Sequence, residues 1–130
     1  MSDYTIKNLA DVKDSAPEFG FSDTMEARFA TRDLGGAIVG LARERIKPGR
    51  RVPFAHKHRE QEEVYVVLAG SGRVKIEDDV HDVKQWDLIR VGPGTTRNFE
   101  AGPGGLDLLA FGAPVSVGND VEMLPGWWSD

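Results

Sequence analysis

Two histidines lie one residue apart near the middle of the chain, at His56 and His58, and an acid follows at Glu63, where an apolar run begins. Residues two apart on an extended strand point to the same side, so both imidazoles would face one ion. A turn through residues 59–62 can bring the Glu63 carboxylate back across from them. Two neutral imidazoles and a carboxylate make an open three-ligand site, which suits zinc in hydrolases or non-haem iron in oxygenases. The same residues also fit an exposed strand with an acid-rich turn, and spacing alone leaves both interpretations open.

The composition restricts the chemistry that such a site can use. The chain has 130 residues and no cysteine, which excludes disulfides, thiolate zinc sites and thiol nucleophiles. Any metal must therefore be held by histidine, carboxylate and water. A formal charge of -5 and an isoelectric point near 5.2 argue against a nucleic-acid partner, because a phosphate backbone needs a concentrated basic surface.

The sequence carries no recognisable targeting or membrane signal. Its first residues include acids and lack the apolar stretch of a secretory signal. No apolar run approaches the roughly 20 residues that cross a bilayer. We therefore expect a cytoplasmic protein with no membrane partner.

Glycine and proline interrupt the sequence at short intervals and leave β-rich runs between them. There are fifteen glycines and seven prolines, and several cluster in groups such as residues 70–72, 92–94 and 102–105. Short β-rich runs separated by turn residues are typical of a β-sandwich or barrel. We predict strands over residues 36–46, 63–70, 86–91, 95–101 and 106–112, and a hairpin over 73–83.

Alternation along the predicted strands places further side chains beside the candidate ligands. Tyr65 shares a strand face with Glu63, and Phe99 shares one with Arg97. The two aromatic rings would line the pocket as apolar walls, or else form plain barrel core. Phe54, just before the histidines, would flank the mouth of the pocket.

The spacing around the histidines resembles the first conserved motif of the cupins. That motif runs Gly, five residues, His-x-His, three or four residues, Glu, six residues, Gly. Here Gly49 is followed by six residues and then by His56. Four residues separate His58 from Glu63, and six more lead to Gly70. The match is specific because several fixed spacings agree at once.

The second cupin motif is recognisable but eroded. It runs Gly, five residues, Pro-x-Gly, two residues, His, three residues, Asn, and this sequence keeps its middle glycine as Gly94. The other four positions hold Trp86, Gly92, Arg97 and Ala101. We expect Trp86, an indole where the family has a turn glycine, to pack under apolar cover.

The resemblance covers residues 37–113 and implies an all-β fold, the double-stranded β-helix or jelly-roll barrel of small bacterial cupins. Residues 1–36 would form an N-terminal arm with edge strands, and residues 114–130 a short C-terminal tail. The two tryptophans of the tail would pack on the barrel or on a partner subunit. Small cupins often pair through N-terminal strands or packed sheets, so the resemblance also implies a homodimer.

In the resemblance, His56, His58 and Glu63 occupy three of the four metal-ligand positions, and Arg97 takes the fourth. A guanidinium group stays protonated and has no free lone pair, so Arg97 cannot coordinate an ion. In one interpretation the three ligands keep a divalent metal (Fe, Mn, Zn or Ni), and Arg97 clamps a small anionic ligand beside it. In the other, Arg97 pairs with Glu63 and the protein is a metal-free binding module. The intact first motif favours the metal.

The cupin fold hosts several kinds of activity, so the fold does not choose between them. We expect the barrel to bind a divalent metal and a small-molecule ligand. Two enzymatic interpretations fit: a non-haem iron dioxygenase, and a sugar isomerase or epimerase that acts through zinc or manganese. The non-enzymatic interpretation is a small-molecule sensor or storage protein.

Overall fold

The computed structural model describes residues 2–129, and most of its regular structure is antiparallel β. The strands are β1 (Met25–Phe29), β2 (Gly40–Ile46), β3 (Phe54–His58), β4 (Glu62–Ile76), β5 (Asp79–Lys84), β6 (Leu88–Val91), β7 (Arg97–Ala113) and β8 (Val121–Pro125). The helical elements are η1 (Leu9–Asp11), η2 (Ala16–Phe19) and α1 (Thr31–Leu34). Within the described range, no helix has the length and apolar character needed to cross a membrane.

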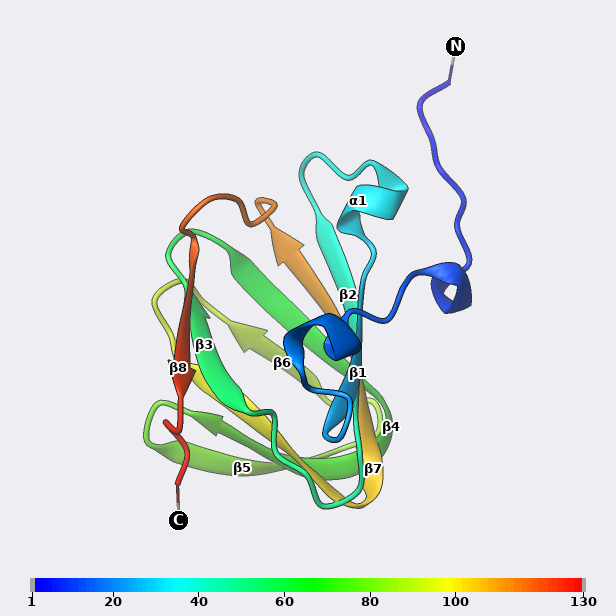
Figure 1. Ribbon diagram of the computed structural model, residues 1–130. Coiled ribbons are helices and arrows are strands. Elements are labelled where there is room, and N and C mark those ends of the chain that lie inside the picture. The colour runs from blue at the N-terminus through cyan, green and yellow to red at the C-terminus, as the bar shows by residue number, and fades with distance from the viewer. Residues whose placement is uncertain (1, 130) are drawn as a thin grey trace.

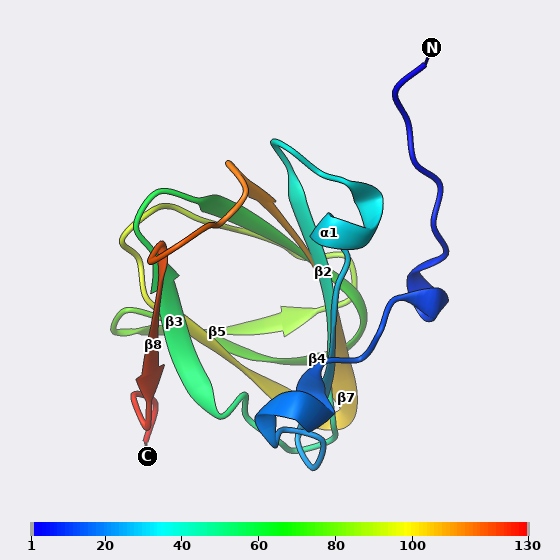
Figure 2. The ribbon, with the colours of Figure 1, turned by 45° about the horizontal axis from the view of Figure 1, so that its top comes forward.

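The two longest strands, β4 and β7, bend and take part in two sheets that face each other (Figures 1 and 2). The β2 sheet has the order β1-β2-β7-β4-β6 and uses the later half of β7 and the earlier half of β4. The β3 sheet has the order β8-β3-β7-β4-β5 and uses the other halves of the same two strands. The predicted all-β jelly-roll barrel is thereby confirmed.

The glycines of residues 70–72 and 102–105 lie inside β4 and β7, contrary to the prediction that they form turns between strands. A Cβ on Gly72 would lie 2.1 Å from the carbonyl oxygen of Glu100 on the paired strand. The pairing register also shifts just before this point. Glycine allows the two backbones to approach closely where the strands bend. The same residues therefore bend a continuous strand instead of ending it.

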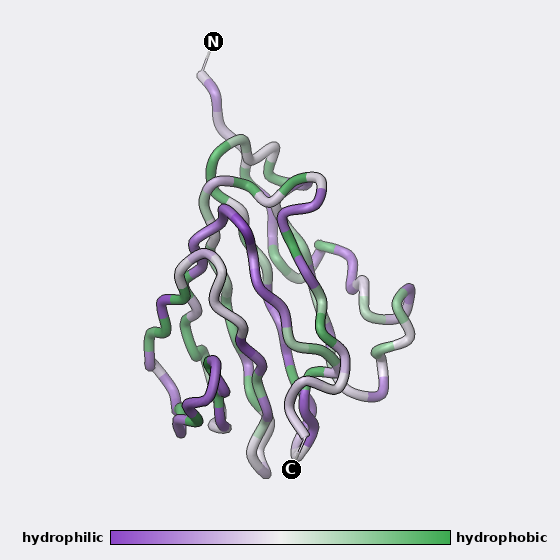
Figure 3. Tube along the Cα trace, turned by 90° about the vertical axis from the view of Figure 1, so that its left-hand side faces the viewer, coloured by the Kyte–Doolittle hydropathy of each residue, from purple (hydrophilic) through white to green (hydrophobic). Residues whose placement is uncertain are grey.

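The core lies between the two sheets. Hydrophilic and hydrophobic residues alternate along the strands (Figure 3), so each strand turns one face inward. The buried apolar residues include Ile46, Val52, Tyr65, Val67, Val74, Val83, Val91, Phe99, Leu106 and Leu108. Burial of this apolar surface is the main driving force for folding. A polar side chain on the inward face therefore needs a specific partner or a function.

Segments outside the predicted barrel residues 37–113 pair with strands inside them. β1 extends the β2 sheet, and β8 lies beside β3 at the edge of the other sheet (Figure 1). Near the C-terminus, Trp128 is buried, with the guanidinium carbon of Arg51 4.2 Å from its ring centre. The domain boundaries and the homodimer remain predictions.

Trp86 lies at the turn that precedes β6 and is exposed, contrary to the expectation of apolar cover. Its exposed fraction is 67%, and its φ of 73° lies in the left-handed region. That region favours glycine, which explains why the cupin motif has a glycine at this position. The backbone of the turn, rather than packing, constrains this residue.

The close approach at Gly72 provides a test of the continuous strands. We expect Gly72→Ala to lower the free energy of unfolding by about 1–3 kcal/mol, because the added methyl group would push two paired strands apart. Gly104→Ala is the matched control: apart from its chain neighbours, no described atom lies within 4 Å of the place that its added methyl group would take, so we expect a change below about 0.5 kcal/mol. Urea unfolding measures both variants, and equal effects would contradict the close pairing.

Candidate metal centre

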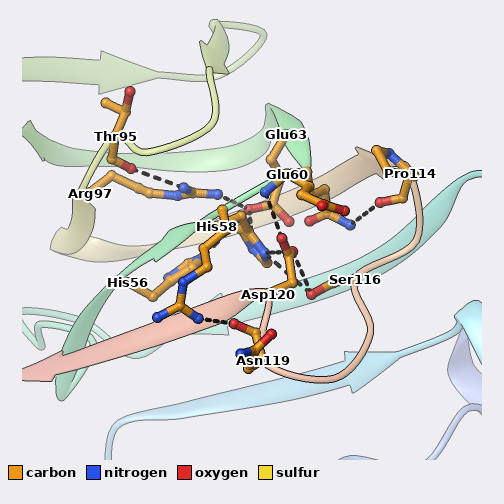
Figure 4. A network of polar contacts seen from close by, with 12 residues as sticks. His56, His58, Glu60, Glu63, Thr95, Arg97, Pro114, Ser116, Asn119 and Asp120 are labelled. Carbon is orange, nitrogen blue, oxygen red and sulfur yellow. Dashed lines mark hydrogen bonds and ion pairs between the residues drawn. The ribbon is translucent and has the colours of Figure 1, made fainter.

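The three candidate ligands meet inside the barrel and come from both sheets. His56 and His58 lie on β3, whereas Glu63 lies near the start of β4 in the β2 sheet. A ring nitrogen of each histidine and a carboxylate oxygen of Glu63 all lie within 4.8 Å of one another. The two imidazole rings are 5.2 Å apart between centres and almost perpendicular. Figure 4 shows these side chains gathered with Arg97.

One oxygen of Glu63, Oε1, is the meeting point of the centre. It lies 3.5 Å from Nε2 of His56 and 3.8 Å from Nε2 of His58. The Tyr65 hydroxyl donates to it at 2.5 Å, and Nη2 of Arg97 forms an ion pair with it. Burial opposes ionisation, but the contact with His56, the charge of Arg97 and the Tyr65 hydrogen bond together lower the pKa of Glu63 to about 2. Glu63 is therefore ionised at neutral pH.

His58 is held in one orientation by Asp120, which lies just before β8 (Figure 4). Nδ1 of His58 is 2.8 Å from Oδ2 of Asp120. Asp120 also accepts hydrogen bonds from the backbone N–H of Glu60 at 2.7 Å and from the Ser116 hydroxyl at 2.9 Å. Burial opposes ionisation of Asp120, but these bonds lower its pKa to about 2. An ionised carboxylate only accepts, so Nδ1 donates, and in the neutral imidazole the lone pair is on Nε2, the nitrogen that faces Glu63.

Arg97 pairs with His56 across the strands and is completely covered, with an exposed fraction of 0%. Its Nε donates to the Tyr65 hydroxyl at 3.0 Å, and its Nη1 donates to the Thr95 carbonyl at 3.1 Å. Because Nη2 contacts Glu63, every nitrogen of the guanidinium has a protein partner. In this arrangement the positive charge of Arg97, rather than a direct clamp, would act on a ligand.

The aromatic residues predicted for the pocket differ in how much surface they expose. The Tyr65 ring is buried and packs on Phe99, with 4.7 Å between ring centres, and Phe99 belongs to the core. Phe54 is partly exposed, and its ring centre is 6.5 Å from that of His56. Of these three rings, Phe54 therefore has the most surface to offer a ligand.

Glu44 on β2 is a further ionisable residue of the interior. Its cross-strand partners, Ala27 and Leu108, are buried, so its side chain faces inward with theirs. Burial and the nearby Glu63 carboxylate raise the pKa of Glu44 to about 7, although the charge of Arg97 acts in the opposite direction. A carboxyl group that changes charge near neutral pH is thus built into the barrel.

Asp120 and Glu44 are not among the site residues predicted from the sequence. Asp120 is 62 residues from His58, and no local pattern links the two. Glu44 did leave a signal, because it alternates with Ala42 and Ile46 on one strand face while the neighbouring arginines occupy the other. A charged residue on the inward face of a strand is a candidate for function.

The donor set fits a divalent metal. Burial lowers the pKa of His56, so its imidazole is neutral at pH 7, and His58 presents a lone pair on Nε2. With the ionised Glu63, three donors of the types that bind zinc, iron or manganese face a common point. Arg97 repels a nearby cation and already pairs with Glu63. The contacts therefore allow either a bound metal or an internal ion pair.

Comparison with known proteins agrees with this architecture. The family model described as the cupin domain matches residues 42–109, just over half of the chain. The chain belongs to the cupin family. The matched segment of this cupin contains the three candidate ligands and Arg97.

Relatives of this cupin support the fold but leave its activity open. An uncharacterised protein of Methanocaldococcus jannaschii is 32% identical over 82 residues, which cover 62% of this chain and 66% of that protein, just under two thirds of its length. A cupin protein of Bacteroides fragilis has a TM-score of 0.71 and 19% identity, covering 92% of this chain and 91% of the other. Oxalate decarboxylase of Bacillus subtilis has a TM-score of 0.75 and 23% identity, covering 92% of this chain and 33% of the other. The structural likenesses show the fold alone.

The raised pKa of Glu44 predicts a pH-dependent stability. Glu44 ionises near 4.5 without the fold and near 7 within it, so its ionisation costs stability as the pH rises through this interval. We expect Glu44→Gln to match the wild type near pH 4 and to be more stable at pH 8, by on the order of 2 kcal/mol. Urea unfolding in the presence of a metal chelator measures the difference.

The matched control for this experiment is Glu122→Gln. Glu122 lies on β8, and its side chain is 44% exposed. We expect this variant to differ from the wild type by less than about 0.5 kcal/mol at both pH values. A Glu44→Gln variant without added stability at pH 8 would contradict the placement of Glu44 in the interior.

Proposed function

We propose that this cupin binds one divalent metal through His56, His58 and Glu63 and holds a small anionic ligand beside it. The observation that supports the proposal most strongly is the hydrogen bond between His58 and Asp120. A carboxylate on one ring nitrogen fixes the tautomer and makes the other nitrogen a better donor, as is common for metal-binding histidines. The lone pair on Nε2 of His58 faces the ionised Glu63. A cation between these two electron-rich groups would stabilise both.

The charges of the centre favour an anionic ligand. A divalent ion beside one carboxylate leaves a net charge of about +1, and Arg97 adds another positive charge close by. Such a centre would attract a small carboxylate or phosphate. A bound ion would supply Lewis acidity or an oxygen-activating site. Because Arg97 is covered, the ligand would contact the partly exposed His56 and Phe54 instead.

The identity of the metal decides which activity follows. Iron would favour a dioxygenase, because two histidines and a carboxylate are typical of non-haem iron centres. Zinc or manganese would favour an isomerase or epimerase, or a binding role without turnover. Nickel is a further candidate for the same three ligands.

A metal-free binding protein is the second candidate function, and the Glu63–Arg97 ion pair favours it. Arg97 and Tyr65 already satisfy the Glu63 carboxylate without any ion. Buried pairs of this kind neutralise a carboxylate internally. The histidines would then act as hydrogen-bonding groups toward the ligand.

Metal content tests the first candidate. We expect the purified protein to contain close to one metal ion per chain by elemental analysis, and His58→Ala to lose it. Asp120→Asn should weaken metal affinity about 10–100-fold, because it removes the carboxylate that orients His58. His81→Ala, which alters an exposed histidine on β5, is the matched control and should keep the metal. A wild-type protein that is well folded, contains no metal and takes up no added ion would contradict the proposed metal binding.

Substitution at Arg97 separates the two candidates. Arg97→His replaces a buried cation with a possible fourth ligand. If the protein is metal-free, this variant should acquire an affinity for zinc that the wild type lacks. If the wild type holds a metal, the variant should bind it more tightly, because charge repulsion is lost and a ligand is gained. Zinc titration calorimetry on both proteins makes the comparison, and weaker binding by a well-folded variant would contradict both.

A further inference from the structure

The inner face of the β2 sheet carries an ionisable group beyond the metal centre, the carboxyl of Glu44. Glu44 pairs with Leu108 on β7, and Leu108 pairs in turn with Val67 on β4. Val67 lies four residues beyond Glu63 along the same strand and on the same face. Glu44 therefore lies at the level of Val67, further along the β2 sheet than the candidate ligand Glu63.

Glu44 has no hydrogen-bond or ion-pair partner among residues 2–129. Every fully buried side-chain nitrogen or oxygen in that range does have a partner, so the unpartnered carboxyl oxygens of Glu44 retain some accessible surface. The residue is accordingly only partly buried. An unpartnered carboxyl in an enclosed interior is costly, and a ligand that hydrogen-bonds to it would gain affinity.

On β2 and β7 the inward positions between Glu44 and the metal centre are small, whereas β4 places the buried Tyr65 at the same level. Ala42 precedes Glu44 on the inward face of β2, and it pairs with Ala110 on β7. Ala110 pairs with Tyr65, whose hydroxyl is turned toward Glu63. No long side chain of β2 or β7 therefore stands at this level between the two carboxyl groups.

We propose that Glu44 recognises the end of the ligand opposite its anionic group, and that the ligand is therefore a small hydroxycarboxylate. The inference rests on the proposed function, in which the carboxylate end lies at the positive metal centre. The other end would extend over the two alanines toward Glu44. A hydroxyl both donates and accepts hydrogen bonds, so it suits Glu44 in either protonation state. An apolar end would leave Glu44 unpaired, and a second carboxylate would repel its ionised form.

The charged and titratable groups around Glu44 are consistent with this role. Burial and the Glu63 carboxylate favour its protonated form, and Arg97 favours its ionised form. Tyr65 also senses the charge of Glu44, and its own pKa is raised well above the usual value, chiefly by burial, so it stays neutral. With a pKa of about 7, Glu44 populates both forms at neutral pH. A hydroxyl is the ligand group that can pair with both.

The test compares butyrate with its 2-, 3- and 4-hydroxy derivatives by titration calorimetry on zinc-saturated protein. We expect at least one hydroxybutyrate to bind about tenfold more tightly than butyrate, as a hydrogen bond to a charged or titrating group would give. Glu44→Met, which keeps the side-chain length but cannot form this bond, should reduce that preference to less than about twofold. Glu44→Gln should retain part of it, because an amide also donates and accepts.

Glu26→Gln is the matched control, since Glu26 lies on the neighbouring strand β1, where it pairs with Arg45. It should keep the wild-type preference. Equal affinity for all four acids would overturn the assignment of Glu44 while leaving anion binding at the metal centre intact. A preference that survives in Glu44→Met would also overturn it, because the hydroxyl would then be bound elsewhere. If zinc and butyrate both fail to bind, the proposed function itself fails.

Discussion

The ionised carboxylate of Glu63 is the group on which the polar interior of this cupin depends. It projects from the β2 sheet and meets Arg97 and two histidines of the facing β3 sheet, so it joins the two halves of the barrel. A buried charge is stable only when it is paired, and its partners here are themselves held in place. Tyr65 and Thr95 fix Arg97, and Asp120 fixes His58.

Arg97 places a permanent positive charge where the cupin motif has a fourth ligand. This charge lowers the affinity of the centre for a metal ion, and it strengthens the attraction of the same centre for anions. Glu44, further along the β2 sheet than Glu63, adds a second acidic group to the interior. With a metal at the centre, the two regions would differ in charge, and a ligand with different groups at its two ends would suit them better than a symmetrical one.

Local patterns in the sequence predicted most strands between residues 36 and 112 and the convergence of His56 and His58, because alternation and motif spacing are encoded over a few residues, whereas β8 lies in the predicted C-terminal tail. The continuity of β4 and β7 was not predictable in this way, since a glycine group such as residues 70–72 looks the same whether it turns a chain or bends a strand. Asp120 was missed because its contact with His58 joins distant segments. Glu44 was missed although it alternates with Ala42 and Ile46 on one strand face, and the pairing register of β2 shows that this face points inward.

The most direct test of the metal centre is a crystal structure of the protein grown with zinc, with anomalous diffraction data collected on both sides of the zinc absorption edge. We predict one strong anomalous peak inside the barrel, from an ion bound by Nε2 of His56, Nε2 of His58 and a carboxylate oxygen of Glu63, with Nδ1 of His58 still hydrogen-bonded to Asp120. An ordered barrel with no peak at these residues, and with Glu63 still paired to Arg97, would contradict it.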